Sequence, residues 1–294
     1  MSTKLIVGCG YLGLRVARRW LAGGHRVIAT VRAADRAAQI AAEGIEPRIA
    51  DVTRRETLLG LPTAETVLYA VGYDRRGSAS RWQVQVDGLR SVLDALPDQT
   101  GRIVYISSTG VYGETEGAWV DESTPCRPLR EAGRALLAAE DVLARHPLAS
   151  RSIVLRLAGL YGPDRLPKIA DLRAGRPLAV SGRGRLNLIH VEDATGVVLA
   201  AAERANPPRT YVVSDGTPVG RREFYRHLAS RLGLPAPTFV EPSPEDLAAQ
   251  RGGGDKRASN ARMLAELGVK LVYPSYREGL GDGQDCPSYD RDKS

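Results

Sequence analysis

The sequence predicts an α/β protein with a doubly wound parallel sheet. Short apolar runs of strand length alternate with amphipathic segments of helical period, and a glycine-rich turn joins the first run to the first such segment within residues 4–32. Parallel strands joined by right-handed crossovers have their carboxyl ends at one edge of the sheet, and ligands bind there, where the strand order reverses. We therefore expect binding residues at the ends of the strands.

The glycine-rich turn predicts a Rossmann-type dinucleotide site. Gly8, Gly10 and Gly13 fit G-x-G-x-x-G, directly after an apolar strand at 5–7 and before a second strand at 27–31. Gly8 allows the tight turn, Gly10 lets a pyrophosphate approach the backbone, and Gly13 lets the helix lie close to the sheet. The helix N-terminus offers free N–H groups to the phosphates, so Tyr11 and Leu12 are also predicted to bind the cofactor. The alternative is a plain structural turn.

The end of the second strand indicates which dinucleotide binds. An NAD site usually has Asp or Glu there, which bonds the ribose 2′-hydroxyl. This chain has Thr30, Val31 and Arg32, with Arg36 one turn further on. Because an arginine can pair with a 2′-phosphate, we predict NADP in preference to NAD. The alternative is that Arg32 is an ordinary solvated charge.

The alternation continues along the chain. Further strands are expected at residues 48–50, 67–71, 102–106, 152–157, 187–190 and 209–214, and further helices at 34–43, 82–96, 131–145, 194–204, 221–232 and 261–267. Asp51 follows the third strand, where an acid lies near the adenine ring or caps the next turn. Gly72 follows the fourth strand and lets the backbone pass under the ribose. Beyond the glycine turn, the predicted cofactor contacts at strand ends are Arg32, Asp51, Val52, Ala70, Val71, Gly72 and Ser107.

Two parts are expected in the chain. Residues 1–163 form the dinucleotide-binding domain, and residues 187–215 return to it. Residues 164–279, where the alternation loosens, form mainly a substrate lobe that contains a mobile glycine loop at 252–254. Residues 280–294 are rich in glycine and charge and are expected to be a disordered tail.

The composition argues against several classes of function. The 294 residues carry a net charge of +7, but the basic residues are dispersed along the chain, which suits an anionic cofactor and does not predict nucleic-acid binding. The three cysteines lack C-x-x-C spacing and the four histidines are scattered, so neither a disulfide framework nor a metal site is expected. No apolar run reaches transmembrane length, and the N-terminus enters a core strand directly. We expect a cytoplasmic protein without a signal peptide or a membrane span.

Four segments together resemble a known family. They are GCGYLG near the start, YISSTGVYG at 105–113, RLAGLYGP at 156–163 and NLIHVEDA at 187–194. Their order and spacing resemble the NAD(P)-dependent epimerase/dehydratase family of extended short-chain dehydrogenases/reductases, up to about residue 279. G-x-G-x-x-G replaces the G-x-x-G-x-x-G of most extended members, as in the atypical subgroup. The resemblance implies an oxidoreductase that moves hydride on a sugar-nucleotide-like or small carbonyl or hydroxyl substrate.

The resemblance also implies catalytic roles. Ser108 matches the residue that hydrogen-bonds the substrate oxygen, and Thr109 can substitute for it. The alternative is a polar strand exit that only satisfies backbone groups. The family's Y-x-x-x-K is missing, because Arg130 and Arg134 stand at the matching positions and an arginine cannot act as a general acid. Arg134 can still supply positive charge and contact the ribose.

Three consequences of the missing motif stay open. Tyr112, Tyr161 or Tyr73 serves as the proton donor, although the first two also suit packing roles in their turns. In the second alternative, the chemistry needs no tyrosine. In the third, the protein binds NADP without turnover, as a sensor or regulator.

The lobe is expected to hold the substrate. The resemblance implies contacts to nucleotide-sugar phosphates from polar and basic side chains, with loop charges as the alternative, and His190 also suits a packing or capping role. The polar and basic side chains that would make these contacts are Arg165, Lys168, Arg183, Arg185, Asn187 and His190. We also expect a small-molecule substrate and a monomer or homodimer.

Overall fold

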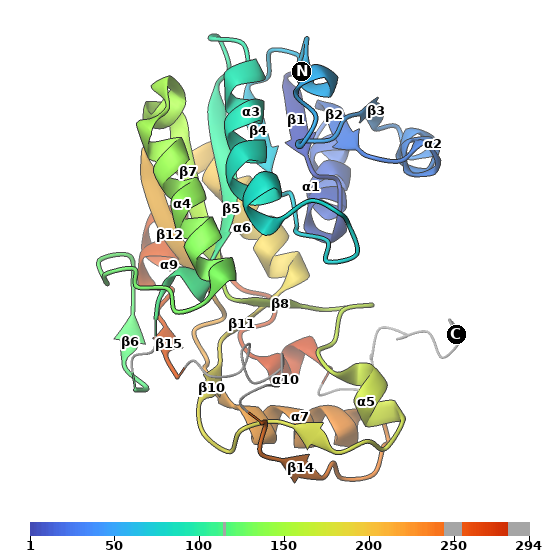
Figure 1. Cartoon of the computed structure of the whole chain (residues 1–294), viewed down its shortest axis with the longest axis vertical. Coiled ribbons are helices and arrows are strands. Elements are labelled where there is room, and N and C mark those ends of the chain that lie inside the picture. The colour runs from blue at the N-terminus through green and yellow to red at the C-terminus, as the bar shows by residue number, and fades with distance from the viewer. Residues whose placement is uncertain (114–115, 244–254, 282–294) are drawn as a thin grey trace.

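A seven-stranded parallel sheet forms the centre of the molecule, in a computed structural model that describes residues 1–113, 116–243 and 255–281 (Figure 1). The strand order is β12-β7-β5-β4-β1-β2-β3, so the chain order reverses between β1 and β4. The predicted doubly wound α/β fold is confirmed. The strands are β1 (Thr3–Val7), β2 (Arg26–Val31), β3 (Glu46–Ile49), β4 (Thr66–Tyr69), β5 (Arg102–Ser108), β7 (Ser152–Leu157) and β12 (Arg209–Val213).

Helices cover both faces of the sheet (Figure 1). The first face packs against α1 (Tyr11–Ala22), α2 (Ala34–Ala42), α6 (Val191–Arg204) and α9 (Ala261–Leu267). The second face packs against the 3-10 helix η1 (Arg55–Leu58), the short π-helix η2 (Gln83–Asp87), α3 (Gly88–Ala95) and α4 (Glu131–Arg145). Because both faces are buried, the inner strands read as nearly continuous apolar runs, whereas the edge strand β3 is polar and largely exposed.

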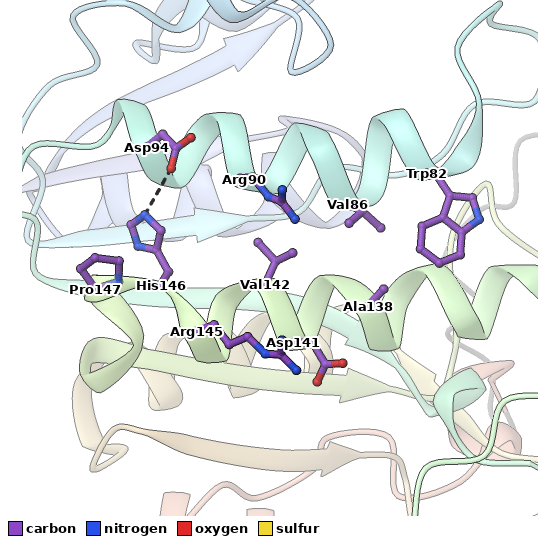
Figure 2. Close-up of a pocket in the computed structure, with 10 residues that line it drawn as sticks. All are labelled: Trp82, Val86, Arg90, Asp94, Ala138, Asp141, Val142, Arg145, His146 and Pro147. Carbon is purple, nitrogen blue, oxygen red and sulfur yellow. Dashed lines mark ion pairs between the residues drawn. The ribbon is translucent and has the colours of Figure 1, made fainter.

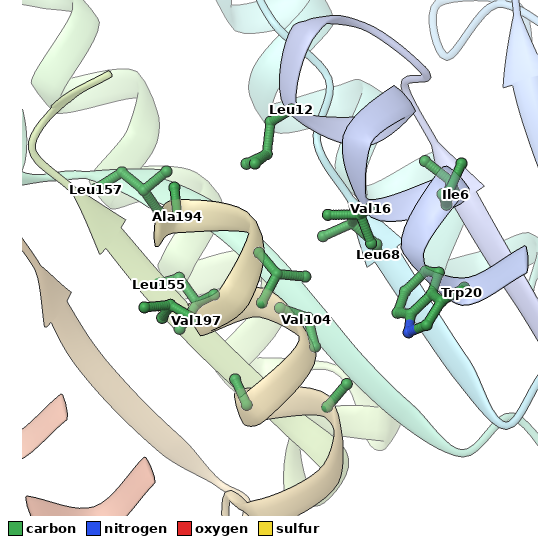
Figure 3. Packing of buried hydrophobic residues seen from close by; sticks show 14 of the residues in the cluster. Ile6, Leu12, Val16, Trp20, Leu68, Val104, Leu155, Leu157, Ala194 and Val197 are labelled. Carbon is green, nitrogen blue, oxygen red and sulfur yellow. The ribbon is translucent and has the colours of Figure 1, made fainter. Parts of the chain in front are cut away.

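The two cores follow from the alternation of side chains along each strand. On β1, Ile6 belongs to the core under α1 and α6, whereas its two neighbours belong to the core under α3 and α4. Figure 3 shows Val16 and Trp20 of α1 and Val197 of α6 in the first core. Apolar faces of the helical segments therefore meet the sheet as their periodicity predicts.

A second, smaller unit lies beyond the carboxyl ends of the strands, below the sheet in Figure 1. Its own apolar core is built around Phe224, Tyr276 and Leu178. Between α4 and this unit the chain forms η4 (Pro147–Arg151) and β7. The unit and its junction with the sheet contain α5 (Ile169–Arg173), α7 (Arg221–Arg231), α10 (Tyr276–Gly279) and four short strand pairs: β8 (Gly159–Tyr161) with β11 (Leu188–His190), β9 (Leu178–Ala179) with β14 (Phe239–Val240), β10 (Arg185–Leu186) with β13 (Val219–Gly220), and β6 (Trp119–Val120) with β15 (Arg257–Ala258).

Some element boundaries differ from the expected ones. The helix expected at 194 begins at Val191, because His190 caps it by accepting a hydrogen bond from the Glu192 amide at 3.3 Å. The strand expected to end at 106 continues to Ser108. Leu280 is buried, so the ordered chain extends into the segment expected to be a tail. The rest of that expectation, residues 282–294, and the glycine loop at 252–254 lie outside the described residues.

Within the described ranges, no helix combines the length and the apolar character that a membrane span requires.

Candidate functional site

A cleft of about 930 Å³ opens at the carboxyl ends of β1, β2, β3 and β4. It lies at the point where the strand order reverses, which is where a doubly wound sheet binds its ligands. The ends of these strands and the loops that follow them form its walls. Several residues predicted to contact the cofactor line it: Gly8, Gly10, Arg32, Asp51, Val52, Ala70, Val71 and Gly72.

The glycine turn has two structural positions and one open position. Gly8 has φ +96°, and an added Cβ would lie 2.8 Å from the backbone of Ala70. A Cβ on Gly13 would overlap the carbonyl oxygen of Gly8. Gly10 is different, because a Cβ there would meet nothing within 4 Å. Gly8 and Gly13 are therefore needed for close packing of the backbone, whereas Gly10 leaves free space in the cleft for a ligand.

The residues that open α1 face in different directions. Gly10 is the N-cap residue of this helix, and no acidic side chain lies in its first turn. The Leu12 side chain is buried in the core, so only its backbone can face a ligand. The Tyr11 hydroxyl donates a hydrogen bond to the Pro163 carbonyl at 2.7 Å. This hydrogen bond joins the helix to the segment after β8, and the Tyr11 ring centroid lies 4.2 Å from the Arg15 guanidinium of the same helix.

Charged groups line the cleft. The side formed by β2 and β3 carries Arg32, Arg36, Arg54 and Asp51, whereas Asp74 follows β4, on the other side of β1. Arg32 Nη2 lies 3.4 Å from Asp74 Oδ2. Neither Arg54 nor Asp74 was predicted from the sequence to line the site. Arg54 stands three residues after Asp51, and that closeness to a predicted strand end was the available signal.

Asp51 both lines the cleft and caps a turn. Its Oδ1 accepts hydrogen bonds from the Thr53 amide at 2.9 Å and the Thr53 hydroxyl at 2.7 Å. Desolvation alone would raise the pKa of Asp51, but these hydrogen bonds and the nearby Arg32 and Arg54 lower it below the ordinary value. The carboxylate is therefore ionised at neutral pH.

The hydroxyl groups of the SSTGVYG segment make internal hydrogen bonds. Ser107 is buried and donates to Glu140 Oε1 at 2.5 Å. Ser108 accepts from the Gly110 amide at 3.1 Å and so caps the turn η3 (Thr109–Val111). In the described part of the chain, Ser107, Ser108 and Thr109 do not belong to the cleft lining. The cofactor contact of Ser107 and the catalytic roles of Ser108 and Thr109 stay predictions.

A buried ionic network lies behind this segment. Arg156 of β7 pairs with Glu140 of α4, with Nη2–Oε2 at 2.6 Å and both side chains at most 10% exposed. Arg156 Nη1 also donates to the Tyr112 hydroxyl at 2.8 Å. Burial would lower the pKa of Arg156, but Glu140 outweighs it and raises that pKa above its ordinary value. The signal in the sequence was the charged Arg156 within an otherwise apolar strand. Glu140 lies on the buried face of the amphipathic α4, and its pairing with Arg156 was not predicted.

The three tyrosines considered as proton donors lie in different surroundings. Tyr112 is buried, and its burial raises its pKa to about 12 although Arg156 opposes this. Tyr161 is also buried, and its hydroxyl donates to the Ser275 carbonyl at 3.3 Å. Tyr73 lines the cleft, and its ring centroid lies 4.2 Å from the Arg81 guanidinium. Tyr112 and Tyr161 are buried outside the cleft lining of the described structure, and Tyr73 is the candidate that faces the cleft. The identity of the proton donor stays a prediction.

The start of α4 packs against the SSTGVYG segment through a glycine. A Cβ on Gly133 would overlap the carbonyl oxygen of Gly110. Arg134 is exposed, and its Nη1 donates to the Leu129 carbonyl at 3.2 Å. Arg134 is outside the cleft lining of the described structure, so its proposed ribose contact stays a prediction.

Most of the polar and basic residues expected on the substrate side make hydrogen bonds or ion pairs within the protein. The Asn187 side chain makes two hydrogen bonds to the backbone of residues 256–258. It donates to the Lys256 carbonyl at 2.9 Å and accepts from the Ala258 amide at 2.6 Å. Arg165 donates to the Leu160 carbonyl at 3.2 Å, and Arg185 lies 3.7 Å from Asp255. Burial lowers the pKa of His190 to about 4, so its imidazole is neutral at physiological pH. Lys168 is the residue before α5 and has a left-handed backbone with φ +55°. The Arg183 backbone amide donates a hydrogen bond to Ser181 Oγ at 3.1 Å.

A second, smaller groove of about 490 Å³ lies between α3 and α4 (Figure 2). Trp82, Val86 and Arg90 line one side of it, and a 3.5 Å contact of His146 with Asp94 closes one end. The groove is on the outer surface of the two helices, not at the strand ends, so the cleft carries the candidate site. Within the described residues, no group of three or more Cys, His, Asp or Glu side chains is arranged to hold a metal ion.

Comparison with known proteins supports a family assignment. Residues 5–214 match the NAD dependent epimerase/dehydratase family. Protein YeeZ of Escherichia coli K12 is 31% identical over 283 residues, which cover 93% of this chain and 97% of YeeZ. The 3-diazoavenalumate denitrifying reductase of a Streptomyces species is 28% identical over 311 residues, covering 94% of this chain and 98% of the reductase. The solved structure of a functionally unknown conserved protein from Silicibacter pomeroyi DSS is 32% identical in sequence and matches with a TM-score of 0.78. This match covers 95% of this chain and 97% of the other protein's chain. The chain belongs to the NAD dependent epimerase/dehydratase family.

Proposed function

We propose that this protein binds NADP and transfers hydride between the nicotinamide and an oxygen-bearing carbon of a small molecule. The substrate is sugar-nucleotide-like or a small carbonyl or hydroxyl compound. One observation carries the proposal: the strand-end cleft combines a glycine turn at a helix N-terminus with three arginines on one side. A dinucleotide presents phosphates to the first feature and a ribose to the second.

The cleft suits a dinucleotide in size and in shape. Its volume of about 930 Å³ is that of a small-molecule site. Gly10 keeps open the space that a side chain would fill, next to the free N–H groups that begin α1. Absence of an acid from the first turn of α1 leaves the positive end of the helix dipole available to a pyrophosphate.

The charges beyond the ends of β2 and β3 favour NADP over NAD. Arg32, Arg36 and Arg54 can pair with a 2′-phosphate. The Thr30 hydroxyl at the same strand end accepts a hydrogen bond from the Gly8 amide at 3.2 Å, so it supports the glycine turn. The acid expected of an NAD site is absent from the end of β2.

The chain's own residues divide the remaining work. Ser108 or Thr109 orients the substrate oxygen, and Arg134 contacts the ribose or an anionic group. Tyr73 is the tyrosine that faces the cleft, so it is the first candidate to supply a proton. When bound, the nicotinamide supplies or accepts the hydride. The reductase similar to this chain over nearly its full length supports an enzymatic role.

The first experiment is a titration of the protein with NADPH and with NADH, followed by nicotinamide fluorescence and thermal melting. We expect tighter binding of NADPH. Gly10→Val should abolish binding of both without unfolding the protein, because an added Cβ meets no neighbour. Gly196→Val is the matched control, since Gly196 of α6 also has nothing within 4 Å and does not line the cleft.

The outcomes separate the proposal from its alternatives. Failure of the wild type to bind either dinucleotide would overturn it, as would normal binding by Gly10→Val. Tight binding with no oxidation of NADPH across a panel of nucleotide sugars and small carbonyl compounds would instead favour a sensor that binds NADP without turnover.

A further inference from the structure

One ion pair crosses the cleft. Arg32 follows β2 and Asp74 follows β4, and β1 lies between these two strands in the sheet. Neighbouring strands are about 5 Å apart, so the ends of β2 and β4 are about 10 Å apart. The 3.4 Å contact between Arg32 Nη2 and Asp74 Oδ2 therefore spans the carboxyl end of β1, from which the glycine turn leaves.

Asp74 is held in position by its own loop. Its Oδ1 accepts a hydrogen bond from the Arg76 amide at 3.0 Å, which leaves Oδ2 to face Arg32. This backbone hydrogen bond, and secondarily Arg32, lowers the pKa of Asp74 below its ordinary value. A fixed negative charge therefore faces the arginine that stands at the end of β2.

We propose that Asp74 limits the preference of the cleft for NADP over NAD, by competing with the 2′-phosphate for Arg32. The inference rests on the proposed function. A 2′-phosphate on Arg32 must share the guanidinium with the Asp74 carboxylate or displace it, so part of the pairing with Arg32 is lost. A 2′-hydroxyl is neutral and does not compete with Asp74 for Arg32. Arg36 and Arg54 supply the positive charge that keeps NADP favoured.

The exposure of the pair sets the size of the effect. The Arg32 and Asp74 side chains are 62% and 42% exposed, so water and salt screen the competition. The effect on affinity is therefore modest, and it should shrink as ionic strength rises. It should act on NADPH and leave NADH nearly unchanged.

Asp74→Asn tests the inference. The Asn Oδ1 can still accept from the Arg76 amide, so the loop keeps its turn while the charge is lost. In fluorescence titrations at low ionic strength, the dissociation constant for NADPH should fall about three- to fivefold. The constant for NADH should change less than about twofold. Asp94→Asn is the matched control, because Asp94 pairs with Arg55 at 2.7 Å outside the cleft and should affect neither cofactor.

A second variant separates competition from direct repulsion. In an Arg32→Ala background, Asp74→Asn should lose most of its effect on NADPH, because nothing is left to compete for. Equal changes for the two cofactors, no change for NADPH, or a full effect without Arg32 would each overturn the inference while the proposed function stands. If the wild type binds neither cofactor, both fall together.

Discussion

The buried pair of Glu140 and Arg156 provides the sharpest test of how this fold is stabilised. Glu140→Gln removes the negative charge at nearly constant shape and leaves the Arg156 guanidinium buried without its counter-ion. Arg156 Nε and Nη2 donate to the two Glu140 oxygens at distances of 2.6 to 3.2 Å, and Ser107 donates a further hydrogen bond at 2.5 Å. The amide can keep only part of this set, because one of its two polar atoms is a donor.

The expected cost follows from this geometry. Removing one partner of a buried ion pair costs about 3–5 kcal/mol, because the other charge stays desolvated. We expect a loss of about 3 kcal/mol in the free energy of unfolding, read from urea titrations that follow the buried Trp20 by fluorescence. Glu43→Gln is the matched control. Its partner Arg18 is bound by two short hydrogen bonds of 2.6 and 2.9 Å, but these side chains are 31% and 54% exposed, so the loss should stay below about 1 kcal/mol.

A double variant completes the test. Glu140→Leu combined with Arg156→Met removes both charges, so it should recover at least half of the loss seen with Glu140→Gln. The recovery is incomplete because the Tyr112 hydroxyl loses its donor. A loss below about 1 kcal/mol for Glu140→Gln, or a double variant as unstable as the single one, would refute the reasoning.

Three further changes have defined outcomes. Arg32→Glu should weaken NADPH binding and strengthen NADH binding relative to the wild type, and an unchanged preference in fluorescence titrations would remove Arg32 from the site. Gly8→Ala should lower the melting temperature, because a Cβ would lie 2.8 Å from the backbone of Ala70 and φ is +96°; unchanged melting would contradict that packing. Burial raises the pKa of Asp215 to about 7, so between about pH 4 and pH 7 the folded protein holds a proton that the unfolded chain releases. The Asp215 contribution to stability should fall as pH rises through this window, whereas His190, with its lowered pKa, contributes in the opposite direction. The difference in unfolding free energy between wild type and Asp215→Asn should therefore fall with rising pH; parallel pH curves for variant and wild type in urea titrations would contradict it.

Local patterns in the sequence determined the fold and the position of the cleft. The apolar run, glycine turn and amphipathic helix at the start of the chain predicted β1, α1 and β2. The helix at Glu131–Arg145 and the strand at Ser152–Leu157 have the expected bounds. This works because burial of one helix face, or of both strand faces, is written at short range as a period of apolar residues. Parallel topology then brings the strand ends to one edge without further information.

Contacts between polar side chains distant in sequence were decided only by the tertiary structure. Arg32 meets Asp74 across 42 positions, and Tyr11 reaches Pro163 across 152. Arg156 is an exception within an apolar strand, but the pattern does not name its partner, and Glu140 is one of several charged residues in an amphipathic helix. An ion pair or hydrogen bond needs only two complementary groups at close range, and this chain has 41 basic and 34 acidic residues. Many pairings are therefore chemically equivalent in the sequence, and only the packing of the strands and helices selects the few that form.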